Sequence, residues 1–154
     1  MALQLSTRGR YGVRAVRLLA DRYGNGPISI HTIAAKERIP IRYLEQIMTR
    51  LRREGILNSI RGPGGGYQLT ASPDRMSVGR VIQALEGTVS VARCVDENQG
   101  ARCSLQKTCT TRDFWKKLSQ TIQHILDNVT LQELVQNDWK ENDLKTIATN
   151  RDIG

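Results

Sequence analysis

Residues 39–69 read IPIRYLEQIMTRLRREGILNSIRGPGGGYQL, and this stretch decides the fold. In its first half, apolar residues recur at steps of three and four, the period of a helix with one buried face. These residues are Ile39, Leu44, Ile47, Met48 and Leu51. The opposite face carries Arg42, Glu45, Gln46, Thr49, Arg50 and Arg53. Gly55 is suited to end a helix, so we expect a short helix whose exposed face is rich in basic and amide groups.

A β-hairpin is expected directly after this helix. Two short apolar segments, residues 56–60 and 67–69, flank a glycine-rich turn at 62–66, and Arg61 stands beside the turn. A helix with a basic exposed face fits the DNA major groove, and a hairpin with a cationic tip reaches a neighbouring groove or phosphate. The pattern predicts a winged helix-turn-helix, a mainly α fold with a small β-hairpin wing. An ordinary surface helix and hairpin is the alternative that the local pattern leaves open.

The distribution of charge favours a polyanionic partner for the N-terminal half. The chain has 154 residues and a formal net charge of +8. Residues 1–75 contain 13 Lys and Arg against 5 Asp and Glu, whereas residues 76–154 contain 10 of each kind. The positive excess coincides with the stretch expected to read DNA, and charges present only for solubility would not be so unevenly placed.

Three further helices complete a predicted DNA-binding domain over residues 1–87. They are expected at about residues 7–23, 29–38 and 77–86. The buried stripe of the first is expected to be Val13, Val16, Leu19, Ala20 and Tyr23. Its other face carries Arg10, Arg14 and Arg17. These arginines would either contact DNA phosphates or lie free in solvent.

A long amphipathic helix is predicted to follow a loop at residues 88–111. Its apolar stripe is Trp115, Leu118, Ile122, Ile125 and Leu126. Because the 1–87 domain is expected to close its own core, a second copy of the chain is the economical cover for this stripe. A homodimer would also place two reading helices about one DNA turn, roughly 34 Å, apart. Residues 112–137 are thus assigned to dimerisation, ending in a short helix that begins at a capping box, and 138–154 to a flexible tail.

Three cysteines, Cys94, Cys103 and Cys109, lie in the 88–111 loop. Thiolates bind soft metals, and three in one loop can converge on a single site. Their spacing lacks the Cys-x-x-Cys pair of zinc ribbons and of redox proteins. The loop is also too polar for three unrelated core cysteines. An iron–sulphur cluster with one non-cysteine ligand fits this pattern best, and structural zinc is the alternative.

Several other classes of protein are not favoured by the sequence. No segment is apolar over the length needed to cross a bilayer, so we expect a cytoplasmic protein without a membrane partner. The glycines at 62–66 lack the Lys-Ser/Thr of a P-loop and lie inside a hairpin. No Ser-His-Asp or paired-carboxylate arrangement is evident, so we expect neither an enzyme nor a small-molecule substrate.

Four features together resemble the IscR-type family of winged-helix transcription regulators, over about residues 3–137. They are the N-terminal STRGRYGVRA, the helix RYLEQI, the wing RGPGGGY, and a three-cysteine loop before a long helix. The family includes the iron–sulphur regulator IscR, the nitric-oxide sensor NsrR and the cluster-free cysteine-metabolism regulator CymR. The resemblance implies a homodimer that binds double-stranded promoter DNA, often with affinity or sequence choice set by cluster state, at genes for cluster assembly or stress.

The resemblance also implies roles for particular residues. Those that match the base-contacting part of the family's helix are Arg42, Tyr43 and Glu45, and Arg61 with Gly62 matches the wing that enters the minor groove. With their neighbours, the predicted DNA-binding residues are Arg42, Tyr43, Glu45, Gln46, Arg61, Gly62, Gly64 and Gly65. The residues that match the three cluster ligands are Cys94, Cys103 and Cys109. A [2Fe–2S] cluster is favoured, and a [4Fe–4S] cluster is possible.

The sequence departs from the family at the fourth cluster ligand. Arg112 stands where IscR sequences carry a histidine, and Arg10 stands where NsrR-like members use an aspartate. Arginine is not expected to ligate iron. The spacing between the first two cysteines is also longer than in IscR. The fourth ligand stays open among Asp96, Glu97, Asp113, solvent, a small thiol and, more remotely, His124. In a cluster-free member, the loop would instead be a thiol or zinc switch, or would lie beside a protein partner.

Overall fold

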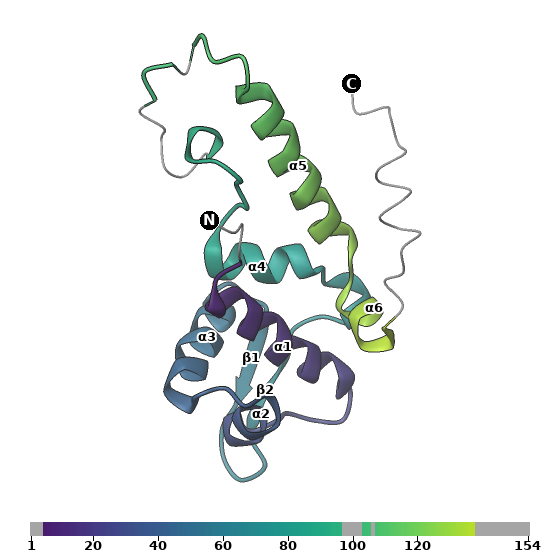
Figure 1. Ribbon diagram of the computed structural model, residues 1–154. Helices are drawn as coiled ribbons and strands as arrows, with labels where there is room; N and C mark the ends of the chain where they lie inside the picture. Colours follow the sequence, from purple (N-terminus) through teal and green to yellow (C-terminus); the bar gives the residue numbers. More distant parts are fainter. Residues whose placement is uncertain (1–4, 97–102, 106, 138–154) are drawn as a thin grey trace.

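A computed structural model describes residues 5–96, 103–105 and 107–137 of the chain. In order, its elements are α1 (Thr7–Asp21), α2 (Ile30–Glu37), α3 (Ile41–Arg53), β1 (Leu57–Ile60), β2 (Gly66–Leu69), the 3-10 turn η1 (Pro73–Arg75), α4 (Val78–Glu86), the 3-10 turn η2 (Arg93–Val95), α5 (Arg112–Asn128) and α6 (Leu131–Gln136). Helices α1 to α4 and the hairpin form one body, and α5 extends away from it (Figure 1). The predicted winged-helix fold is confirmed. The predicted tail at 138–154 lies outside the described residues.

Hydroxyl side chains cap most of the helices at their first turn. Ser6, Ser29 and Ser77 each accept a hydrogen bond from the backbone N–H three residues later, at 3.2, 3.1 and 3.2 Å. Thr130 and Glu133 form the predicted capping box, in which the Thr130 N–H donates to Glu133 Oε2 at 2.6 Å and the Glu133 N–H donates to Thr130 Oγ1 at 3.2 Å. Each of these caps is made by a residue within one turn of the helix start, so the local sequence favours a helix start at these positions.

The wing, residues 57–69, is an antiparallel hairpin in which Leu57 faces Leu69 and Ile60 faces Gly66. Its base is fixed to the segment before α2, because the Ile28 N–H donates to the Tyr67 carbonyl at 2.9 Å and the Tyr67 N–H donates to the Ile28 carbonyl at 2.8 Å. Glycine is required at 66, since a Cβ there would collide with the Ile28 carbonyl. The base of the wing is thus held in place, while its tip reaches solvent.

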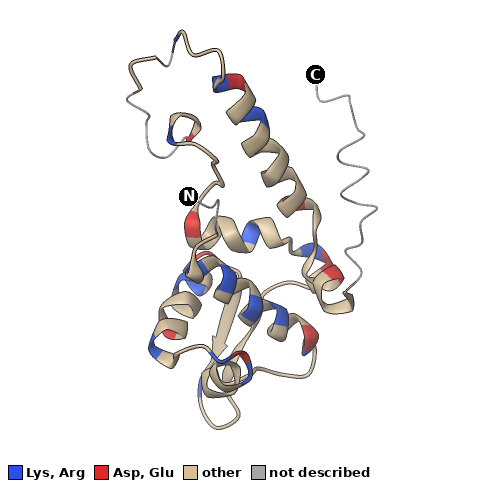
Figure 2. Cartoon of the chain, in the orientation of Figure 1, with Lys and Arg blue, Asp and Glu red and all other residues tan. Residues whose placement is uncertain are grey.

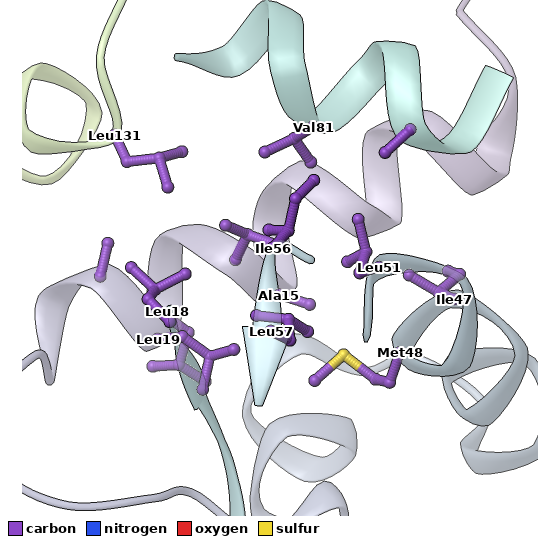
Figure 3. Close-up of a cluster of buried hydrophobic side chains, with 14 of the residues drawn as sticks. Ala15, Leu18, Leu19, Ile47, Met48, Leu51, Ile56, Leu57, Val81 and Leu131 are labelled. Atoms are coloured by element: carbon purple, nitrogen blue, oxygen red, sulfur yellow. The ribbon is translucent and has the colours of Figure 1, made fainter. Parts of the chain in front are cut away.

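Helix α3 supplies the centre of the hydrophobic core, as its apolar spacing predicts. Its buried residues are Leu44, Ile47, Met48 and Leu51. They pack with side chains from α1, the wing and α4 (Figure 3). Leu131 of α6 is fully buried in the same core. The expectation that residues 1–87 close the core alone is corrected by this contact, because α6 covers part of it.

Helix α1 packs more closely against α4 than its predicted stripe implies. Tyr23 lies beyond the end of α1 and is 46% exposed, so it is not part of the buried stripe. Gly9 and Gly12 are buried instead. A Cβ at Gly12 would collide with the Leu85 side chain of α4. The two helices therefore approach at a glycine, a contact that a count of apolar residues overlooks.

Helix α5 leaves most of its apolar side chains partly open to solvent. Ser119 is the one buried residue of this helix. Phe114 is 60% exposed and Leu118 is 36% exposed, whereas Leu126 packs on the core. Neither α5 nor any other helix in the described part of the chain combines the length and apolar content needed to cross a bilayer.

Candidate DNA-binding surface and cysteine loop

The exposed face of α3 borders an open hollow of about 600 Å³, which we call the α3 hollow. It is lined by Arg8, Arg42, Glu45, Gln46, Thr49, Arg50 and Arg53. Figure 2 shows Lys and Arg positions along α1 and α3 on this body of the protein. Three predicted DNA-binding residues, Arg42, Glu45 and Gln46, thus lie together on one exposed surface. The sequence did not single out Arg8, which comes from the first turn of α1.

Tyr43 differs from its neighbours in the predicted set because its side chain is half-buried. Its ring meets the ring of Tyr11 edge to face, with centroids 5.9 Å apart and an angle of 84° between the planes. Such aromatic pairs prefer this arrangement and resist reorientation. Tyr43 therefore ties the first turn of α3 to α1.

The predicted wing residues form a separate exposed tip. Arg61, Gly62 and Gly64 are exposed, and the Gly65 N–H donates to the Gly62 carbonyl at 2.9 Å across the turn. The backbone angle φ is +95° at Gly62 and +74° at Gly64, which favours glycine at both positions. None of the described residues that line the α3 hollow comes from the wing, so the structure presents two distinct contact surfaces.

Two of the three arginines on the outer face of α1 make contacts within the protein. Arg14 Nε lies 3.1 Å from Glu37 Oε2 of α2, and the Arg14 guanidinium lies 5.6 Å from the centre of the Tyr11 ring. Arg17 Nε donates to the Leu134 carbonyl of α6 at 3.3 Å. These two side chains join α1 to its neighbours while staying exposed, so a contact of either with DNA phosphate stays a prediction.

Glu86, the last residue of α4, connects that helix to the start of α1. Its carboxylate accepts a hydrogen bond from the Gly9 N–H at 2.8 Å and a second from the Ser6 hydroxyl. A carboxylate is favourable at a helix N-terminus because the first N–H groups lack partners within the helix. The contact holds the turn that carries Arg8, one of the residues lining the α3 hollow.

Glu86→Ala is expected to lower the free energy of unfolding by about 1 kcal/mol, because it removes one of the two acceptors of the Gly9 N–H and the charge at the first turn of α1. It should also weaken DNA binding through the loosened Arg8. Urea denaturation and fluorescence anisotropy with duplex DNA measure the two effects. Gln83→Ala, at another exposed position of α4, is the matched control. Equal effects from both substitutions would contradict the role assigned to Glu86.

The described residues do not bring the three cysteines into one metal site. Cys94 lies in η2 and is half-buried, Cys103 is exposed, and Cys109 is half-buried before α5. In the part of the chain that the structure describes, no group of three His, Cys, Asp or Glu side chains is placed to hold a metal ion. Glu97, one predicted candidate for the fourth ligand, lies outside the described residues. Asp113 is exposed on α5.

The donor chemistry of the loop nevertheless suits a soft metal. All three cysteines are free thiols. A hydrogen bond with the Thr111 hydroxyl, at 3.4 Å between Sγ and Oγ1, lowers the pKa of Cys109 below its ordinary value, and the backbone N–H of Thr111 adds to this effect. A lower pKa raises the fraction of thiolate at neutral pH, and thiolate is the form that binds metal. The donor types therefore fit an iron–sulphur cluster.

Comparisons with known proteins agree with the fold and place the chain among transcriptional regulators. The model of the Rrf2 family, described as an iron-dependent transcriptional regulator, matches residues 5–137. The HTH-type transcriptional regulator IscR of Sodalis glossinidius is 38% identical over 156 residues, which cover 96% of this chain and 92% of that protein. Among solved structures, CymR, the global cysteine regulator of B. subtilis, matches with a TM-score of 0.75 and 33% identity, covering 88% of this chain and 98% of CymR.

The IscR of T. potens matches with a TM-score of 0.72 and 34% identity, covering 89% of each chain. These relatives are transcriptional regulators, so the prediction of a DNA-binding regulator that is not an enzyme is confirmed, as is the resemblance to IscR-type proteins. The chain belongs to the Rrf2 family of transcriptional regulators.

Proposed function

We propose that this regulator binds promoter DNA as a homodimer through α3 and the wing, and that an iron–sulphur cluster on its three cysteines adjusts the binding. The α3 hollow is the observation that supports this most, because it gathers exposed basic and amide groups on a helix whose other face fills the core. Promoter binding would place its action in the cytoplasm, where bacterial DNA lies.

In this proposal, Arg42, Glu45 and Gln46 contact base edges in the major groove. Arginine pairs with guanine, glutamine with adenine, and glutamate accepts from cytosine. The affinity contributed by these three side chains would therefore depend on the base sequence. Arg8 and Arg53 lie at the same hollow and would contact phosphates, which position the protein without reading sequence. Tyr43 orients the start of α3 through its contact with Tyr11.

The wing would make the second contact, in the minor groove. Arg61 supplies the cation, and a narrow minor groove attracts arginine through its negative potential. Gly62, Gly64 and Gly65 have no side chains, so the backbone of the tip can approach the DNA closely. The two contacts together would fix the register of one protomer on a half-site.

The apolar face of α5 supports the homodimer. Phe114 and Leu118 are exposed large apolar residues, and they lie on a 17-residue helix in which Ser119 alone is buried. An α5 paired with the α5 of a second copy would cover these side chains. In this arrangement, residues 1–87 bind DNA, the 88–111 segment carries the cysteines, and residues 112–137 hold the dimer together.

Leu118→Glu tests the dimer, because it places a charge in the proposed apolar interface. We expect the dimer dissociation constant, measured by analytical ultracentrifugation, to rise at least about 10-fold, equivalent to about 1.4 kcal/mol. Affinity for a two-half-site duplex should fall in parallel. Gln120→Glu is the matched control, since it adds the same charge to the polar face of α5. A wild-type protein that is monomeric and indifferent to duplex DNA at low salt would overturn the proposed function.

The cysteine-bearing segment would connect the cluster to DNA binding. Cys94, Cys103 and Cys109 would hold the cluster, as [2Fe–2S] by preference or as [4Fe–4S]. The family's description as iron-dependent supports this assignment. When bound, the cluster supplies a redox- and ligand-sensitive group. The segment connects α4 to α5. A change in its conformation on cluster binding would therefore change the position of the DNA-binding domain relative to the paired α5 helices, and with it the spacing of the two α3 helices on DNA. Genes for cluster assembly or stress are the targets that this sensing would serve.

A further inference from the structure

A second concavity lies away from the DNA-facing surface, between α5 and residues 88–96. It is a cleft of about 500 Å³, which we call the α5 cleft, and its volume is in the range of small-molecule sites. Two hydrogen bonds hold its wall to the helix. The Val89 N–H donates to the Gln123 side-chain oxygen at 3.4 Å, and the Val91 N–H donates to Ser119 Oγ at 3.1 Å. These two bonds hold residues 89 and 91 against α5.

The cleft is lined by the polar face of α5. Lining positions 112, 116, 119, 120, 123, 124 and 127 recur at steps of three and four, so they share one face of the helix. The exposed apolar residue Leu118 and its neighbours at 122 and 125 lie on the opposite face. Pairing of two α5 helices through that apolar face would leave the cleft open.

Two cations line the cleft one helical turn apart, Arg112 and Lys116. Asp96 also lines it, while Asp127 lies 15 residues from Arg112, about 22 Å along the helix axis. Asp127 accepts a hydrogen bond from the Gln123 amide at 2.9 Å. Asp96 therefore offsets part of the positive charge of Arg112 and Lys116. The remaining positive charge suits a singly charged anionic group better than a multiply charged one.

Arg112 has an unmet hydrogen-bonding requirement. Its Nε atom is buried and has no hydrogen-bond partner among the described residues. Buried donors are normally satisfied, because leaving one without an acceptor costs free energy. The planar N–H groups of a guanidinium match the two oxygens of a carboxylate. Val89 and Val95 add apolar surface to the cleft, which suits an organic molecule.

We propose that the α5 cleft binds a small organic carboxylate, with Arg112 and Lys116 holding its anionic group. The ligand is bound and not converted, so the site is that of an effector. Cys94 lines the same cleft, which places the effector against the cysteine-bearing segment. The proposal does not depend on a cluster, and it concerns the cluster-free full-length chain.

Isothermal titration calorimetry of that chain with butyrate, succinate and inorganic phosphate, at constant ionic strength, tests the proposal. We expect saturable binding of a carboxylate, one molecule per chain. Arg112→Gln should weaken it about 10-fold or more, the scale of a lost charged hydrogen bond. Lys117→Gln removes the same charge from the same helix at a position that does not line the cleft. The affinity of this variant for the carboxylate should therefore match that of the wild type.

Protection of cysteines provides a second readout that needs no variant. Butyrate should slow alkylation of Cys94 by iodoacetamide, measured by mass spectrometry, and leave Cys103 unaffected, since Cys103 is exposed and does not line the cleft. Absence of saturable carboxylate binding, tighter binding of phosphate, equal losses in the Arg112 and Lys117 variants, or equal protection of both cysteines would each overturn the proposal. None of these outcomes bears on promoter binding, which is measured separately.

Discussion

Arg42→Ala is expected to weaken binding to the preferred DNA sequence by about 1–3 kcal/mol and to leave binding to unrelated duplex DNA almost unchanged. Arg42 is exposed in the first turn of α3 and lines the α3 hollow with Glu45 and Gln46. A side chain that reads a base contributes to discrimination, so its removal should lower the ratio of specific to non-specific affinity. The duplex to use is the one that the wild-type protein enriches from a randomised pool, and anisotropy titrations give both affinities.

Arg8→Ala should behave differently although it removes the same charge from the same hollow. A phosphate contact carries no sequence information, so affinity should fall for all duplexes and the slope of log affinity against log salt should decrease by about 1. Arg75→Ala, an exposed arginine of η1 that does not line the α3 hollow, serves as the control for net charge. If the Arg42 variant discriminates between duplexes as well as the Arg75 control does, Arg42 does not read the sequence.

The unit made by α3 and the wing could be predicted because its signals are local. Leu44, Ile47, Met48 and Leu51 occur at helical spacing and all are buried in the structure. The glycine-rich turn expected at residues 62–66 is present, with positive φ angles at Gly62 and Gly64. Neither feature depends on which distant segment packs against it, so periodicity and turn chemistry are sufficient.

Contacts between distant segments could not be predicted in the same way. Glu86 meets Gly9 across 77 positions, and Arg17 meets the Leu134 carbonyl across 117. No spacing rule relates residues so far apart, so neither the contact that holds the turn carrying Arg8 nor the contact of Arg17 with α6 could be predicted. For the cysteines, residue type indicates soft-metal donors, but the path of the loop between them decides whether three thiols meet. The ligand set stays a prediction from residue type, and the described residues do not show the three thiols together.

Cys103→Ala is expected to abolish stable cluster binding, because it removes one of the three proposed protein ligands. Loss of groups that merely support a metal ligand costs about 10- to 100-fold in metal affinity, so loss of a ligand itself should cost at least as much. Cys103 is exposed and free in the structure, so its replacement should disturb the fold little. The measurement is anaerobic purification followed by an absorption spectrum and by counts of iron and sulphide per chain.

Ser104→Ala is the matched control, since Ser104 is the exposed neighbour of Cys103 and has no thiol. The control should keep the iron, the sulphide and the visible absorption of the wild type, and both variants should unfold at the same temperature as the wild type. Retention of an intact cluster by the Cys103 variant would remove Cys103 from the ligand set. A colourless wild-type protein that contains zinc in place of iron would instead exclude the cluster, while leaving the expected effects at Arg42 and Arg8 in force, because these depend only on the surface of α3.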